Sequence, residues 1–285
     1  MSDFFSYFFL YEGRPAAGLL SREHVFMCTF ILFHLFLLAI FLGSKYKNSP
    51  KAINVILRIS AFIMIGLYIA EVSEGFIVLF YEHGDILNTP KGQNRLLGSI
   101  VNCLPLYLCD IAIFAIPIIA FTKGRIRTML SDFLAIWGIP MGVIGTYLAG
   151  NVFLKAPAFS FDGLLCIFIH VVPAAVTVFL YVTGLASLQK KNMWPTTWAF
   201  MGFCAFVLFY NHLFNPYFGT NFMFFFGGDG TPFDLFRPYV RIEVYQLIVL
   251  ILYVSYMLLF YYCYFFIRKK ISKRKEELEN KTVAA

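Results

Sequence analysis

The sequence predicts an all-α integral membrane protein with about seven transmembrane helices, its N-terminus outside and its C-terminus in the cytoplasm. Three observations predict this fold class. Of the 285 residues, 60% are hydrophobic and only 14% are charged, whereas soluble domains carry about 25% charged residues. The apolar residues form runs of about 20 residues, the length needed to cross a bilayer. Basic residues are concentrated in alternate loops, as the positive-inside rule describes.

Seven apolar runs, separated by polar residues, glycine and proline, are the candidate spans. They cover residues 24–43, 53–81, 97–121, 131–153, 162–187, 197–215 and 240–267. They leave room only for short loops, so we expect one transmembrane domain, residues 1–267, followed by a basic cytoplasmic tail, residues 268–285. No second, soluble domain is expected.

The orientation follows from the basic residues. Sixteen of the 23 Lys and Arg residues lie on one side of the predicted bundle, and this side is assigned to the cytoplasm. The net charge of +7 therefore reflects membrane topology. We expect a multi-pass protein of the cell membrane that does not bind nucleic acid.

The cysteines and the longest loop give two smaller expectations. Six cysteines lie inside apolar runs, and none has metal-ligand spacing, so we expect no disulfide, no metal and no cofactor. The loop between the last two spans contains the apolar segment 222–226. We expect it to pack on the helices or enter the bilayer, because exposed irregular backbone is not tolerated in lipid.

Polar side chains within the spans share one depth. Such residues are costly in lipid, and they face the bundle interior or water. Here they cluster in the outer leaflet and the midplane, whereas the inner halves are nearly free of ionisable residues. This segregation predicts one polar cavity that opens to the outer side or the outer leaflet. The alternative is a network of hydrogen bonds that joins the helices. The candidate residues are Glu71, Glu74, Asn102, Cys109, Asp110, His170, Asn211, His212, Asn215 and Asn221.

Cys109 and His170 are a candidate nucleophile and base. A thiol becomes a good nucleophile when a neighbouring base or cation favours the thiolate. Pro105 should break the helix before Cys109 and free backbone polar groups near the thiol. A buried, inert cysteine is the alternative interpretation. Glu71 and Glu74 share a helix face and are candidates for acid–base roles, cation binding or pairing with arginine. His212 is an alternative base.

Three segments resemble a known family. Leu104-Pro105-Leu106-Tyr107-Leu108-Cys109-Asp110 resembles the Leu-Pro-Leu-His-Leu-Cys signature of the YwaF-like bacterial integral membrane proteins. His170-Val171-Val172-Pro173 resembles that family's histidine segment in the fifth helix. Asn215, followed by Gly219-Thr220-Asn221-Phe222-Met223, is similar to its Asn…Gly-Thr-Asn-Tyr-Met segment.

The resemblance implies an activity. The YwaF-like proteins are related to the eukaryotic transmembrane protein 164, an acyltransferase that remodels ether phospholipids with a Cys in helix 3 and a His in helix 5. The histidine role falls on His170. The eukaryotic Asn-Pro-Cys-His motif places its cysteine at Leu106, and Cys109 lies three residues further on. The resemblance therefore implies a lipid acyltransferase or transacylase that uses membrane phospholipids as substrates.

In this hypothesis the acyl group moves between lipids through an acyl-enzyme on Cys109. His170 transfers the proton, and an asparagine such as Asn215 or Asn221 stabilises the oxyanion. The candidates for substrate binding or oxyanion stabilisation are Asn102, Asp110, Asn211, His212, Asn215 and Asn221.

Two other functions stay open. A seven-helix receptor fits the topology, although the last span has no lysine for a retinal Schiff base. A proton- or cation-coupled transporter fits Glu71, Glu74 and Asp110, although the sequence has no inverted repeat. The oligomeric state is not predicted.

Overall fold

The computed structural model describes residues 8, 15–84, 89–228 and 232–283. All regular secondary structure in these residues is helical, which confirms the all-α class. Six helices in the described chain are long and apolar enough to cross a membrane, and they correspond to six of the predicted spans. They are α2 (Arg22–Tyr46), α3 (Pro50–His83), α6 (Gly124–Tyr147), α8 (Phe161–Thr183), α9 (Lys190–Phe218) and α10 (Ile242–Val283).

The span predicted at 97–121 is not one continuous helix. It is divided into α4 (Pro90–Asn102) and α5 (Ile111–Phe121), with residues 103–110 in a non-helical turn. Pro105 accounts for the break, since proline lacks an N–H and its ring clashes with the preceding helical turn. The exposed carbonyls at the end of α4 are satisfied: Tyr210 donates to Val101 O at 3.0 Å and Tyr68 donates to Cys103 O at 3.1 Å. α5 is apolar but has only 11 residues, so this predicted span is not among the six long helices of the described chain.

Helix starts follow local sequence signals. Ser49 precedes Pro50, and its hydroxyl accepts a hydrogen bond from the N–H of Ala52 at the start of α3. Ser160 caps α8 in the same way by accepting from the N–H of Gly163 at 3.1 Å. Serine is favoured at this position because it satisfies N–H groups that have no partner within the helix. These caps set where the two helices begin at the membrane boundary.

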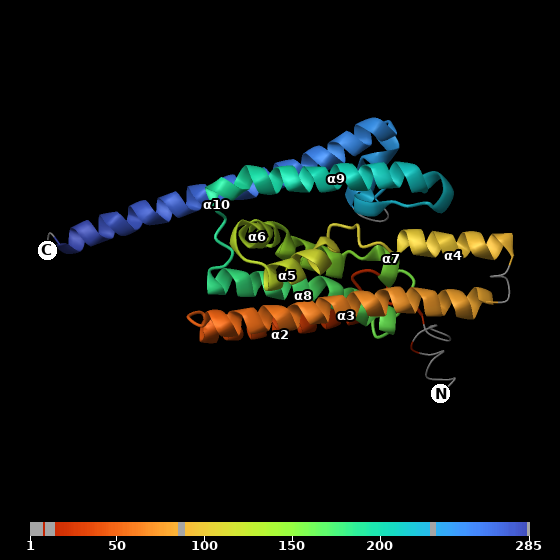
Figure 1. Ribbon diagram of the computed structural model, residues 1–285, viewed down its shortest axis with the longest axis horizontal. Coiled ribbons are helices and arrows are strands. Elements are labelled where there is room, and N and C mark those ends of the chain that lie inside the picture. Colours follow the sequence, from red (N-terminus) through yellow and green to blue (C-terminus); the bar gives the residue numbers. More distant parts are fainter. Residues whose placement is uncertain (1–7, 9–14, 85–88, 229–231, 284–285) are drawn as a thin grey trace.

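The helices run along one long axis (Figure 1). α2 and α3 lie along one side, α9 and α10 pack together on the other, and α5, α6 and α8 lie between them. The last part of α10 extends beyond the other helices, so the basic tail continues this helix as far as Val283. The end of the bundle from which it projects is the predicted cytoplasmic end.

α6 and α8 are closely packed because α6 carries glycines where they meet. A Cβ atom added at Gly138 would lie 1.9 Å from Thr177 Oγ1, and one added at Gly142 would lie 2.4 Å from Ala174 Cβ. Both distances are far below an ordinary van der Waals contact. Small residues at such interfaces let helix backbones approach closely in membranes. This pairing fixes the position of the α8 residues that face α6.

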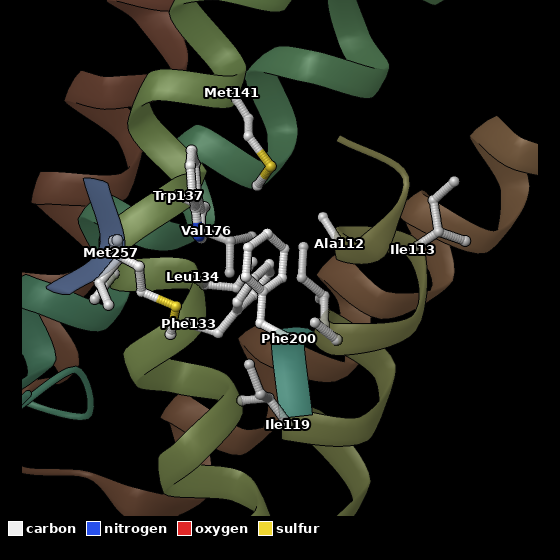
Figure 2. Packing of buried hydrophobic residues seen from close by; sticks show 14 of the residues in the cluster. Ala112, Ile113, Ile119, Phe133, Leu134, Trp137, Met141, Val176, Phe200 and Met257 are labelled. Carbon is white, nitrogen blue, oxygen red and sulfur yellow. The ribbon is translucent and has the colours of Figure 1, made fainter. Parts of the chain in front are cut away.

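The largest hydrophobic core cluster includes a compact group of side chains from the inner part of α6. Figure 2 shows Phe133, Leu134 and Trp137 of α6 gathered with Ala112, Val176, Phe200 and Met257 from other helices. The same cluster continues to Phe222, Met223 and Phe225 of the loop before α10. This packed group fills the interior of the bundle on the predicted cytoplasmic side of Met141.

The loop before α10 packs against the helices, as predicted. Phe222 and Met223 in the short helix η2 (Phe222–Phe224), and the adjacent Phe225, are almost completely buried. Their backbone is held by two tyrosines of α10: Tyr253 donates to Met223 O at 3.2 Å and Tyr245 donates to Phe224 O at 2.8 Å. The loop continues through η3 (Pro232–Leu235) and η4 (Arg237–Tyr239).

Candidate functional site

A cavity of about 800 Å³ lies on the outer side of the hydrophobic core. Its walls come from α3, α4, the 103–110 turn, α6, α8, α10 and the loop before α10. Its volume is within the range of small-molecule sites. Trp137 and Met141 belong to both the core and the cavity wall. The cavity is therefore closed towards the predicted cytoplasmic end by packed apolar side chains.

Six of the predicted site residues line this cavity. They come from four separate segments of the chain, and the structure brings them together. The six residues are Glu71, Glu74, Asn102, Cys109, Asp110 and His170. Within the described residues, no group of three or more His, Cys, Asp or Glu side chains is arranged to hold a metal ion.

Cys109 lies in the non-helical turn, next to a buried carboxyl group. Its Sγ donates to Asp110 Oδ1 at 3.6 Å, and Asp110 Oδ2 accepts from the N–H of Tyr107 at 3.0 Å. Asp110 thus closes the turn and orients the thiol. Leu106, where the eukaryotic motif would place its cysteine, is buried and does not line the cavity. The break in the helix therefore turns Cys109, rather than residue 106, towards the cavity.

His170 is held in one orientation by its own helix. Its Nδ1 lies 2.7 Å from the carbonyl oxygen of Cys166, one turn earlier in α8. A carbonyl only accepts hydrogen bonds, so Nδ1 carries the hydrogen, and Nε2 is the basic nitrogen of the neutral ring. Nε2 makes no hydrogen bond within the described part of the chain. No hydrogen bond in that part joins His170 to Cys109 either.

Gly145 provides the space for the imidazole ring. A Cβ atom at this position would lie 2.0 Å from His170 Cδ2 and 2.4 Å from Nε2. No side chain larger than hydrogen fits there without moving the ring. The ring is therefore held between the Cys166 carbonyl on one side and the backbone of α6 on the other.

Two residues of the α8 face that lines the cavity were not identified as site residues from the sequence. Asp162 and Cys166 line the cavity together with His170. The three residues are spaced four apart, which places them on one face of a helix. This spacing was visible in the sequence and is the signal that would have found them.

The other predicted site residues lie outside the cavity. Asn211 binds the loop before α10 with both ends of its amide: it donates to Phe222 O at 2.8 Å and accepts from the Phe222 N–H at 3.0 Å. Asn215 donates to Thr220 O at 2.8 Å. Asn221 accepts from the N–H of Phe226 at 2.7 Å. These side chains hold the buried loop in place, and the loop in turn supplies Phe224 and Phe233 to the cavity wall.

His212 is also outside the cavity. Its Nε2 lies 3.2 Å from Gln246 Oε1, which joins α9 to α10. Asn102, in contrast, lines the cavity. Its Nδ2 donates to Gly98 O at 3.0 Å and to Phe218 O at 3.2 Å. Of the two predicted histidine bases, only His170 is therefore in the cavity.

Comparison with known proteins identifies one family. The model of the TMEM164 family matches residues 19–272, which includes every wall of the cavity. No curated protein and no solved structure matches the chain. Because the family model covers most of the sequence, the chain belongs to the TMEM164 family.

Proposed function

We propose that this protein is a membrane lipid acyltransferase that moves an acyl chain from one lipid to another through a thioester. One observation carries this proposal: a thiol and an unoccupied imidazole nitrogen line the same cavity, in the half of a membrane bundle predicted to face outwards. A thiol and a base are the parts that covalent acyl transfer requires. Membership of the TMEM164 family supports the same chemistry.

In the proposed reaction, Cys109 attacks the carbonyl carbon of a lipid ester. The thiol proton goes to His170 Nε2, the bond from carbon to the lipid oxygen breaks, and the departing oxygen takes that proton back. The acyl group is then a thioester on Cys109. A hydroxyl group of a second lipid attacks this thioester, and the proton again passes through His170. The reaction requires the Cys109 thiol to come within hydrogen-bond reach of His170 Nε2 when the ester binds, because no hydrogen bond joins the two side chains within the described residues.

This function is tested by acyl transfer in the purified, reconstituted protein. With a labelled phospholipid donor and a lysophospholipid acceptor, His170→Gln should lower the transfer rate by about 10²–10⁴-fold, the usual contribution of a general base. Cys109→Ala should also lower the rate. The matched control is Cys103→Ala, which removes another thiol of the same cavity. Transfer at the wild-type rate by both the Cys109 and the His170 variants would refute the mechanism.

The cavity charge predicts which lipids are used. Four carboxyl groups line it, and no Lys or Arg is among its lining residues, all of which are described. An anionic headgroup would be repelled by these carboxylates, whereas an ammonium headgroup would be attracted. We expect transfer from a phosphatidylcholine donor to exceed transfer from a phosphatidylglycerol donor by about tenfold, or about 1.4 kcal/mol.

The comparison uses donors with identical acyl chains in otherwise identical vesicles. Replacing Glu71 and Glu74 together by glutamine should bring the two rates closer. Equal rates for the two donors in the wild-type protein would contradict the assignment of the carboxyl groups to headgroup selection.

A further inference from the structure

The thiol of Cys166 also lines the cavity, and it lies beside the imidazole of His170. The Sγ of Cys166 lies 3.8 Å from Nδ1 of His170, and both side chains line the cavity. Cys109, in contrast, makes its hydrogen bond to Asp110. Cys166 is only partly buried: it packs against a small hydrophobic cluster on one side and lines the cavity on the other.

The orientation of the ring favours a thiolate at Cys166. Nδ1 carries a hydrogen because it donates to the Cys166 carbonyl at 2.7 Å. The Cys166 sulfur lies 3.8 Å from the same nitrogen. When Nε2 also takes a proton, the resulting imidazolium carries its positive charge next to this sulfur. A neighbouring imidazolium is one of the recognised causes of thiol activation.

The spacing of four residues does not by itself create such a pair. His24 and Cys28 on α2 have the same spacing, but Cys28 is completely buried and does not line the cavity. Both ring nitrogens of His24 are already in hydrogen bonds, one to Thr146 O at 2.9 Å and one from the N–H of Leu20 at 3.2 Å. Cys166 differs because its thiol reaches the cavity and the imidazole beside it has one nitrogen unoccupied.

We propose that Cys166 is a second nucleophile of the cavity, activated by His170, and that it forms a thioester with the acyl chain of a lipid ester. This inference rests on the proposed function for the identity of the acyl donor. The Cys166 sulfur lies on the Nδ1 side of the ring, so its thiol proton leaves to solvent while the imidazolium of His170 stabilises the thiolate. The sulfur attacks the ester carbonyl carbon and the carbon–oxygen bond of the donor breaks. The departing lipid oxygen takes the proton from Nε2, which solvent then restores, and a thioester on Cys166 and a lysolipid remain.

The first test measures thiol reactivity and does not depend on acyl transfer. The full-length protein in detergent is treated with N-ethylmaleimide, and the modification of each cysteine is followed with time by mass spectrometry. We expect Cys166 to react faster than Cys28 and Cys103. His170→Gln should slow Cys166 by at least about tenfold while leaving the rate at Cys103 unchanged. An equal rate at Cys166 with and without the imidazole would overturn the inference, even if the protein proves to be an acyltransferase.

The second test looks for the thioester. Cys109→Ala protein is incubated with a phospholipid that carries a labelled acyl chain, and the label is located by peptide mass spectrometry with and without hydroxylamine. We expect a hydroxylamine-sensitive label on Cys166 that disappears in the Cys109→Ala/His170→Gln double variant. Cys166→Ser serves as a near-isosteric second variant, and its thermal unfolding is compared with that of the wild type.

The outcomes of the two tests separate the two proposals. If wild-type protein transfers acyl groups but Cys166 never carries the label in the Cys109→Ala variant, the role of Cys166 is refuted and the proposed function stands. If no variant, including the wild type, transfers an acyl group, the proposed function fails. In that case a dependence of Cys166 alkylation on His170 would still show the pairing.

Discussion

Replacing Gly145 by alanine is expected to remove most of the acyl-transfer activity while leaving the bundle folded. The new methyl group would lie 2.0 Å from Cδ2 and 2.4 Å from Nε2 of His170, so the ring must move. The ring cannot move away from the methyl group without disturbing the hydrogen bond on its other side, where Nδ1 lies 2.7 Å from the Cys166 carbonyl oxygen. A displacement of about 1 Å in a catalytic group can lower a rate by about 100-fold. The measurement is the transfer rate in reconstituted vesicles.

Two other glycines separate this effect from general damage to a helix. Gly202 of α9 has no atom within 4 Å of an added Cβ, so Gly202→Ala should leave the rate unchanged. Gly142→Ala would meet Ala174 Cβ at 2.4 Å and the His170 carbonyl at 2.9 Å, and it should lower the unfolding temperature by separating α6 from α8. Gly145→Ala with a normal unfolding temperature and a normal rate would show that the ring position does not matter.

The crossings were largely predictable because a lipid-spanning helix needs a long apolar run. Six of the seven predicted spans are continuous helices. The seventh differs because Pro105 and the tyrosine hydroxyls that cap the end of α4 stabilise a broken helix. The proline is visible in the sequence. The hydroxyl groups that bind the carbonyls at the end of α4 belong to Tyr68 and Tyr210 on other helices, so the extent of the break depends on tertiary contacts.

The existence of a cavity was predictable from the depth of the polar residues along the spans, but which of these residues line it was not. Predicted residues on α3, α4, the 103–110 turn and α8 do line a single space. Asn211, Asn215 and Asn221 have the same polarity and similar depth, yet their amides are used by the backbone of the buried loop. Depth gives one coordinate of a side chain and says nothing about its direction around the helix. The spacing of Asp162, Cys166 and His170 would have indicated which face of α8 points to the cavity.

Asp132 shows the same limit in the inner half of the bundle. Asp132 is the second residue of the span predicted at 131–153, so it was not counted among the ionisable groups inside the bundle. The inner halves of the spans were therefore expected to be nearly free of such groups. In the structure α6 begins at Gly124, and Asp132 is completely buried within it. Its carboxylate accepts three hydrogen bonds at the start of α9, from Leu188 N at 2.9 Å, Gln189 N at 3.2 Å and Asn192 Nδ2 at 2.8 Å. It therefore holds the start of a helix other than its own.

Asp132→Ala is expected to give the largest loss of stability of any substitution considered for this chain. Gln189 is the N-cap residue of α9 and makes no side-chain capping bond. Asp132 instead holds the start of α9 from α6, by accepting from the N–H groups of Leu188 and Gln189 and from the side chain of Asn192. Its removal leaves the N–H groups of Leu188 and Gln189 without their acceptor, at about 1–3 kcal/mol for each buried group. A carboxylate at a helix N-terminus also interacts favourably with the helix dipole. We therefore expect a loss of about 3–5 kcal/mol in the free energy of unfolding.

The loss should be measured by denaturant unfolding in detergent and by hydrogen exchange at residues 186–192. Asp132→Asn keeps one acceptor oxygen but places N–H groups opposite N–H groups, so it should be intermediate. Glu243→Ala is the matched control, because it removes a carboxylate from an exposed pair with Arg241, a kind of pair that contributes at most about 1 kcal/mol. If Asp132→Ala and Glu243→Ala unfold at the same denaturant concentration, the carboxylate does not hold α9 to α6. Faster exchange confined to the start of α9 would locate the effect at the cap, since loss of general packing would also expose α8.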